Sequence, residues 1–81
     1  MGIDCEWEFV GVVPDGQSFT IGGLDVWKHK WKETGERIRV KDPLYHSEFI
    51  FQVYEIRNGE KIVTFAAGEF SNCMWGFYVR S

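Results

Sequence analysis

Positive charge is concentrated in one stretch of this 81-residue chain. Residues 26–41 read VWKHKWKETGERIRVK, and Lys or Arg recurs at every second position on each side of Thr34-Gly35. The stretch holds six of the nine cations in a chain with a net charge of -3: Lys28, Lys30, Lys32, Arg37, Arg39 and Lys41. Side chains two residues apart lie on the same face of a β-strand. The spacing therefore predicts a basic surface for an anion, such as an acidic protein patch, a nucleic acid or a phosphorylated ligand.

The Thr-Gly pair predicts that residues 26–41 form a β-hairpin. With Thr34-Gly35 as a two-residue loop, the cations would face one another as three pairs: Lys32 with Arg37, Lys30 with Arg39, and Lys28 with Lys41. The opposite face would carry the remaining large side chains, which are Trp27, His29, Trp31, Ile38 and Val40. Like charges in direct opposition destabilise a sheet. We therefore expect these cations to be neutralised, either by the protein's own carboxylates or by an outside partner.

The distribution of charge fits an acidic partner. Residues 28–41 contain six cations and two carboxylates, a local charge of +4, whereas the rest of the chain contains three cations and ten acids, a charge of -7. A chain with an isoelectric point near 5.3 lacks the overall basic character of a general nucleic-acid-binding domain. We expect a non-enzymatic binding module whose basic hairpin face contacts an acidic protein surface.

Other functions remain open. A single-stranded nucleic-acid binder would use the same cations together with exposed aromatic rings on which bases stack. A small-molecule-binding barrel or minor enzyme would use the interior or mouth of the fold, and a structural subunit would self-associate through an open sheet edge. The charged face also has a purely structural explanation, because an antiparallel sheet often meets water on one side and edge cations block unwanted strand pairing.

Residues with chemical potential are scattered outside the basic stretch. The loop DPLYHSEF places Leu44, Tyr45 and His46 between two strands, where they would either form an accessory contact or plug one end of the fold. The sequence contains neither a G-x-S-x-G nucleophile elbow nor a P-loop. We accordingly predict no catalytic residues and no cofactor.

The two cysteines, Cys5 and Cys73, are far apart in the sequence. They are either reduced thiols or a disulfide that joins the first strand to the last. A metal site would require both of them to converge with His29 and His46, and no C-x-x-C or H-x-x-x-H spacing supports that arrangement. We therefore predict no metal site.

The elements that position these residues are β-strands. Alternating apolar residues, the lack of a helical period and turn signals about every 8–12 residues predict a single all-β domain over residues 1–81. We expect a small antiparallel barrel or rolled sheet of five to seven strands without a substantial helix. The strands are predicted at residues 5–13, 18–21, 24–32, 37–41, 48–57, 60–67 and 73–80.

The strongest hairpin signal is Asn58-Gly59 between two β-rich runs. Both faces of this hairpin are largely apolar, which predicts that it forms the centre of the fold and is covered on both sides. Small residues at Ala66, Ala67 and Gly68 predict close approach of a neighbouring strand or ring.

No targeting signal is apparent in the sequence. The first residues, MGIDCEWEF, lack the basic and apolar regions of a signal peptide, and no apolar run approaches the roughly 20 residues of a membrane span. We expect a cytoplasmic protein without a membrane partner.

Overall fold

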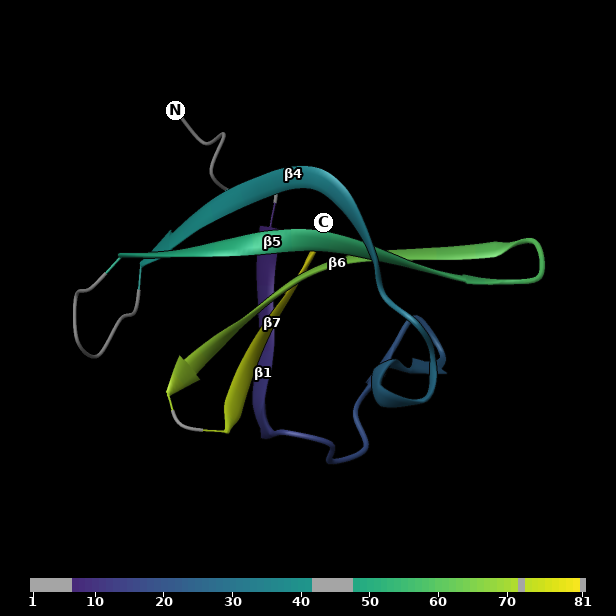
Figure 1. Cartoon of the computed structure of the whole chain (residues 1–81), viewed down its shortest axis with the longest axis horizontal. Helices are drawn as coiled ribbons and strands as arrows, with labels where there is room; N and C mark the ends of the chain where they lie inside the picture. The colour runs from purple at the N-terminus through teal and green to yellow at the C-terminus, as the bar shows by residue number, and fades with distance from the viewer. Residues whose placement is uncertain (1–6, 42–47, 72, 81) are drawn as a thin grey trace.

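The computed structural model describes residues 7–41, 48–71 and 73–80, and all its strands are antiparallel (Figure 1). Five strands form the main sheet in the order β1-β7-β6-β5-β4, and two short strands, β2 and β3, form a separate ribbon. The elements are β1 (Trp7–Pro14), β2 (Thr20–Ile21), β3 (Leu24–Asp25), the 3-10 helix η2 (Val26–Lys28), β4 (Lys32–Lys41), β5 (Glu48–Asn58), β6 (Lys61–Ser71) and β7 (Met74–Arg80). The all-β prediction is confirmed. The sheet is not closed into a barrel, because β1 and β4 lie at its two edges.

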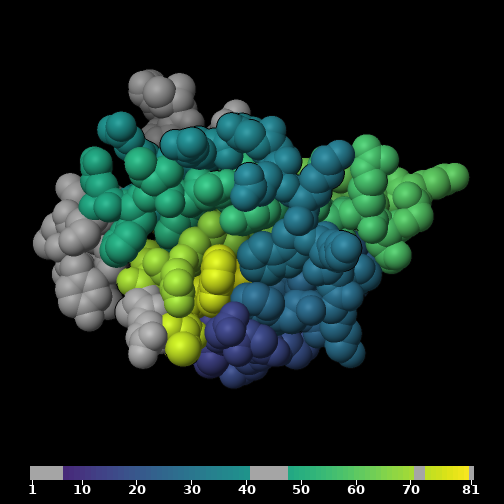
Figure 2. All heavy atoms as spheres, in the orientation of Figure 1, coloured from purple at the N-terminus to yellow at the C-terminus, as the bar shows by residue number. Residues whose placement is uncertain are grey.

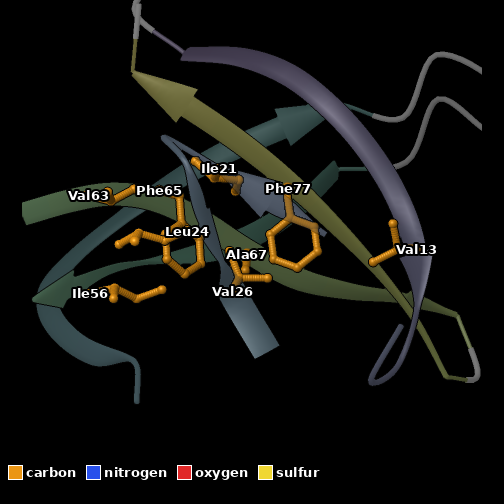
Figure 3. Close-up of a cluster of buried hydrophobic side chains, with 9 residues drawn as sticks. All are labelled: Val13, Ile21, Leu24, Val26, Ile56, Val63, Phe65, Ala67 and Phe77. Atoms are coloured by element: carbon orange, nitrogen blue, oxygen red, sulfur yellow. The ribbon is translucent and has the colours of Figure 1, made fainter. Parts of the chain in front are cut away.

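The β5–β6 hairpin lies in the middle of the sheet and has buried side chains on both faces. Ile56 and Phe65 belong to the cluster on one face, where β2, β3 and η2 lie across the sheet (Figure 3). Phe51 and Val53 belong to a second cluster. The predicted central position is thus confirmed. Its loop is Gly59-Glu60, since Asn58 pairs with Lys61, and this shift of one residue in the loop leaves each side chain on its predicted face.

Residues 26–31 do not continue the strand that begins at Leu24, and the predicted strand over residues 24–32 is wrong. Asp25 ends β3 and caps η2: its carboxylate accepts hydrogen bonds from the Ser18 hydroxyl at 2.7 Å and from the Trp27 backbone N–H at 3.1 Å. Val26 is fully buried, and its carbonyl accepts a hydrogen bond from the Trp31 indole at 2.6 Å. These contacts fold the segment over the sheet.

Large aromatic side chains hold this segment in place. The rings of Trp27 and Trp31 lie 5.2 Å apart between centroids, and both pack edge-on against Phe77 at about 6 Å. Trp31 also meets Phe65 at 5.1 Å. A tryptophan ring packed in this way buries a large apolar surface, which an exposed position on a strand would leave in water. The inward direction predicted for both tryptophans is confirmed, although the backbone that carries them is not a strand.

Thr34-Gly35 is not the turn of a hairpin but part of an irregularity within the single strand β4. The register against β5 shifts between Glu33 and Arg37, and Gly35 has a positive φ of 90°. Thr34 Oγ1 donates a hydrogen bond to the Val53 carbonyl at 3.1 Å, so a side chain bonds to the partner strand where the ladder is interrupted. A bulge and a tight turn both favour a glycine with positive φ, which is why the dipeptide resembles a turn signal.

The predicted close approach at residues 66–68 is confirmed, and β6 extends beyond it to Ser71. Gly68 pairs directly with Gly76 on β7. A Cβ atom on Gly68 would lie 2.3 Å from the Phe51 ring, and one on Gly76 would lie 2.3 Å from the Phe70 ring. The two glycines therefore provide the space in which these two rings pack, 5.3 Å apart between centroids.

Candidate binding surface on strand β4

The six predicted binding cations do not oppose one another, so the three like-charged pairs are wrong. Lys28 ends η2, Lys30 lies in the connection that follows, and the other four lie on β4. Because β4 pairs with β5 and not with residues 26–31, the residues opposite the cations are neutral or acidic: Glu55 for Lys32, Gln52 for Arg37, Ile50 for Arg39 and Glu48 for Lys41. Much of the repulsion expected from the sequence is thereby removed.

Arg37 and Arg39 form the compact part of the basic surface. They lie on the same face of β4, about 7 Å apart along the strand. Both side chains are exposed, and neither forms an ion pair with a carboxylate among the residues that the structure describes. With Ile38 and Ile50 they line an open hollow of about 370 Å³. This combination of two cations around an exposed aliphatic side chain is suited to an anionic ligand that also carries apolar groups.

Ile50 is 59% exposed because the sheet narrows at this end. Residues 48–51 of β5 pair with β4, whereas the pairing of β5 with β6 begins at Gln52 and Ala67. Beyond that point β6 bends away and pairs with β7, which leaves β4 and β5 as a two-stranded ribbon (Figure 1). The predicted cover on both sides of β5 therefore ends before Ile50.

The other face of this ribbon is closed. The Phe70 ring from the end of β6 packs against Phe49 at 5.1 Å and against Phe51 at 5.3 Å. Ile38 and Val40 belong to the same cluster. The ribbon is thus covered on one side, while the exposed side chains of β4 and β5 form part of the outer surface of the molecule (Figure 2).

Glu36, one of the two acids within the basic stretch, is engaged elsewhere. Its carboxylate accepts hydrogen bonds from the Arg80 guanidinium at 2.9 and 3.0 Å, and the same guanidinium lies 4.7 Å from the centre of the Trp7 ring. Among the side chains that the structure describes, no other ion pair is present. It compensates Glu36 with a cation from β7, so Glu36 does not neutralise Arg37 or Arg39.

At the start of the basic stretch, the charged form of Asp25 is stabilised by contacts within the fold. The pKa of Asp25 is lowered, chiefly by the hydrogen bond from Ser18, with smaller effects from the backbone N–H groups of Trp27 and Phe19 and from Lys28. Lys28 therefore has a carboxylate nearby.

Most of the other predicted site residues lie outside the part of the chain that the structure describes. Leu44, Tyr45 and His46 lie outside the described residues, as does Cys5, and the prediction about a disulfide with Cys73 stays open. His29 is half-buried. Over the described residues 7–41, 48–71 and 73–80, no cluster of three or more His, Cys, Asp or Glu side chains suited to a metal is present. In the same ranges, no helix is long and apolar enough to cross a membrane.

Sequence reasoning missed Ile50 and Gln52 as part of the surface. Gln52 is a polar residue between the apolar residues Phe51 and Val53, whereas Ile50 is apolar like its neighbours, so the sequence predicted it to lie inside the hairpin. Comparisons with protein-family models, curated proteins and solved structures find no match to this chain.

Proposed function

We propose that this protein is a non-enzymatic binding module that contacts an acidic surface of a protein partner through the cations of β4 and the segment before it. Arg37 and Arg39 form the centre of this contact, and Lys28, Lys30, Lys32 and Lys41 contribute to the positive field around it. The observation that carries the proposal is the pair of exposed arginines beside Ile50, without an ion pair to a described carboxylate.

The chemistry of the hollow favours a protein over other anions. Arginine is enriched in protein interfaces because its planar guanidinium binds carboxylates through two hydrogen bonds and packs on apolar groups. The exposed Ile50 adds aliphatic surface at the same place. A phosphate group alone would gain nothing from that side chain, whereas an acidic protein segment carries both kinds of group.

The test compares two double variants with the same change in net charge. Arg37→Glu/Arg39→Glu reverses the centre of the surface, and Arg57→Glu/Lys61→Glu reverses two exposed cations at the turn between β5 and β6. A partner captured by the wild-type protein is identified and purified, and its affinity is measured for all three proteins. We expect the first variant to weaken binding at least tenfold, about 1.4 kcal/mol, and the second to have little effect. Equal affinity for all three proteins would refute the proposal.

A single-stranded nucleic acid is the second candidate, because the β4–β5 ribbon presents two arginines on one face. Titration with mixed-sequence oligonucleotides at low salt separates the two. Affinity that falls steeply with added salt and is lost in Arg37→Glu/Arg39→Glu would favour the nucleic acid. The absence of binding would leave the protein partner.

A further inference from the structure

The outer side of β4 is an open sheet edge. In the order β1-β7-β6-β5-β4, β4 has β5 on one side, and no other described segment pairs with it. Over residues 37–41 the register against β5 is regular. The strand therefore offers five residues in regular register, to which another strand can add.

The hydrogen-bond pattern identifies the backbone groups that point outward. The Val53 carbonyl accepts a hydrogen bond from Thr34 Oγ1, so the polar groups of Val53 point toward β4. Backbone groups alternate in direction along a strand, and those of Phe51 and Phe49 therefore point the same way. Their partners on β4 are Ile38 and Val40.

Ile38 and Val40 thus form the ladder with β5, and the residues between them face outward. The backbone N–H and C=O groups of Arg37 and Arg39 point toward the open edge. The two residues that carry the free cationic side chains are the same two that carry the free backbone groups.

We propose that an extended segment of an acidic partner adds to the edge of β4 as an antiparallel strand, paired with Arg37 and Arg39. In that arrangement, residues two apart on the added segment lie directly opposite the two arginines and on the same face of the sheet. Acidic residues at these positions place a carboxylate beside each guanidinium, and an apolar residue between them lies beside Ile38. The expected motif is acidic–apolar–acidic. The inference rests on the function proposed above, since it describes the mode of that contact.

Charge complementarity selects this occupant over a second copy of the chain. Two β4 edges that paired antiparallel about Ile38 would place Arg37 of each copy opposite Arg39 of the other. Like charges directly opposite one another destabilise such a pair. The same arginines that repel a second β4 edge attract an acidic strand.

The test uses three synthetic nine-residue peptides in which valine and glutamate alternate. One is unmodified, one is N-methylated at every glutamate and one at every valine, so all three carry the same charge. In antiparallel addition the glutamate N–H groups point toward β4, and methylation removes these donors and adds bulk at the contact. We expect glutamate methylation to weaken binding at least tenfold, and valine methylation to change it less than threefold.

Each result has a defined meaning. Suppose that the unmodified peptide binds the wild-type protein more tightly than it binds Arg37→Glu/Arg39→Glu, and that both methylated peptides bind the wild-type protein as tightly as the unmodified peptide does. The acidic contact then stands and strand addition is wrong. Loss confined to the valine-methylated peptide would overturn the antiparallel arrangement. If the unmodified peptide does not distinguish the wild-type protein from the variant, the proposed function is refuted as well.

Hydrogen exchange of the backbone amides gives an independent readout. In the free protein, the amides of Arg37 and Arg39 should exchange faster than those of Ile38 and Val40, which bond to β5. Saturation with the unmodified peptide should slow the two arginine amides at least tenfold. An unchanged rate at both arginines in the saturated protein would overturn strand addition.

Discussion

Replacing Gly68 with alanine should destabilise the protein by about 1–2 kcal/mol. The new Cβ atom would lie 2.3 Å from the Phe51 ring, far inside van der Waals contact. Phe51 is 1% exposed and packs between Phe70 and Tyr78, so the ring cannot move without disturbing its neighbours. Overpacking of a core costs about 1–3 kcal/mol. Because Gly68 does not need a positive φ, alanine also gains about 0.4–1 kcal/mol through the unfolded chain, which reduces the net cost.

Gly76 supplies the matched comparison. It is the cross-strand partner of Gly68, and a Cβ atom there would meet the Phe70 ring at the same 2.3 Å. Phe70 is only partly buried, so its ring can rotate toward water. We expect Gly76→Ala to cost less than about 1 kcal/mol.

Urea denaturation of both variants measures the difference. For a domain of this size, a loss of 1 kcal/mol corresponds to a fall of about 4–8 °C in the melting temperature. Phe51→Leu should reduce the cost of Gly68→Ala in a double-mutant cycle, because the smaller side chain leaves room for the methyl group. The reasoning is wrong if Gly68→Ala is as stable as the wild-type protein, or if Gly76→Ala is the more damaging change.

Three further predictions concern local features of the structure. Since the pKa of Asp25 is lowered in the folded protein, its contribution to stability is present above the unfolded pKa near 3.8 and is lost as the pH falls through the folded value. Urea denaturation at a series of pH values should therefore show that the stability of Asp25→Asn falls less steeply in acid than that of the wild-type protein. An equal fall in stability for the two proteins would contradict this. Thr34→Val removes the donor to the Val53 carbonyl and should cost about 1 kcal/mol in thermal unfolding, whereas Thr34→Ser should retain most of the stability. The side chains of Arg80 and Glu36 are 43% and 50% exposed, so a double-mutant cycle should give a coupling energy below about 1 kcal/mol that decreases in 1 M salt. A larger coupling energy that does not depend on salt would show that exposure does not weaken this ion pair.

Local signals predicted the centre of the fold well. Residues 48–57 and 60–67, which are largely apolar on both faces and flank Asn58-Gly59, indicated a central hairpin, and β5 and β6 form it. Gly68 indicated close approach, and the Phe51 ring packs there. These features depend on contacts within or just beyond a hairpin, so residues close in sequence carry the information.

The candidate surface could be predicted only in part. The cations of residues 37–41 were found from their spacing, but their opposing residues were not. Thr34-Gly35 fits either a turn or a bulge, and the choice depends on where Trp27 and Trp31 are buried. Their partners, Phe65 and Phe77, lie more than 30 residues later in the chain.

The sequence alone determined that the chain is built from antiparallel strands, and that Arg37 and Arg39 lie on the same face of one of them. The shared face follows from the two-residue period of a strand, and the antiparallel pairing follows from the short connections between strands. Tertiary structure decided that these arginines lie on an edge strand opposite Gln52 and Ile50. Packing of Trp27 and Trp31 against the core keeps residues 26–31 out of the sheet, and the end of β6 pairs with β7 and not with β5. Long-range packing of aromatic rings thus placed the charges, and no local pattern contains that information.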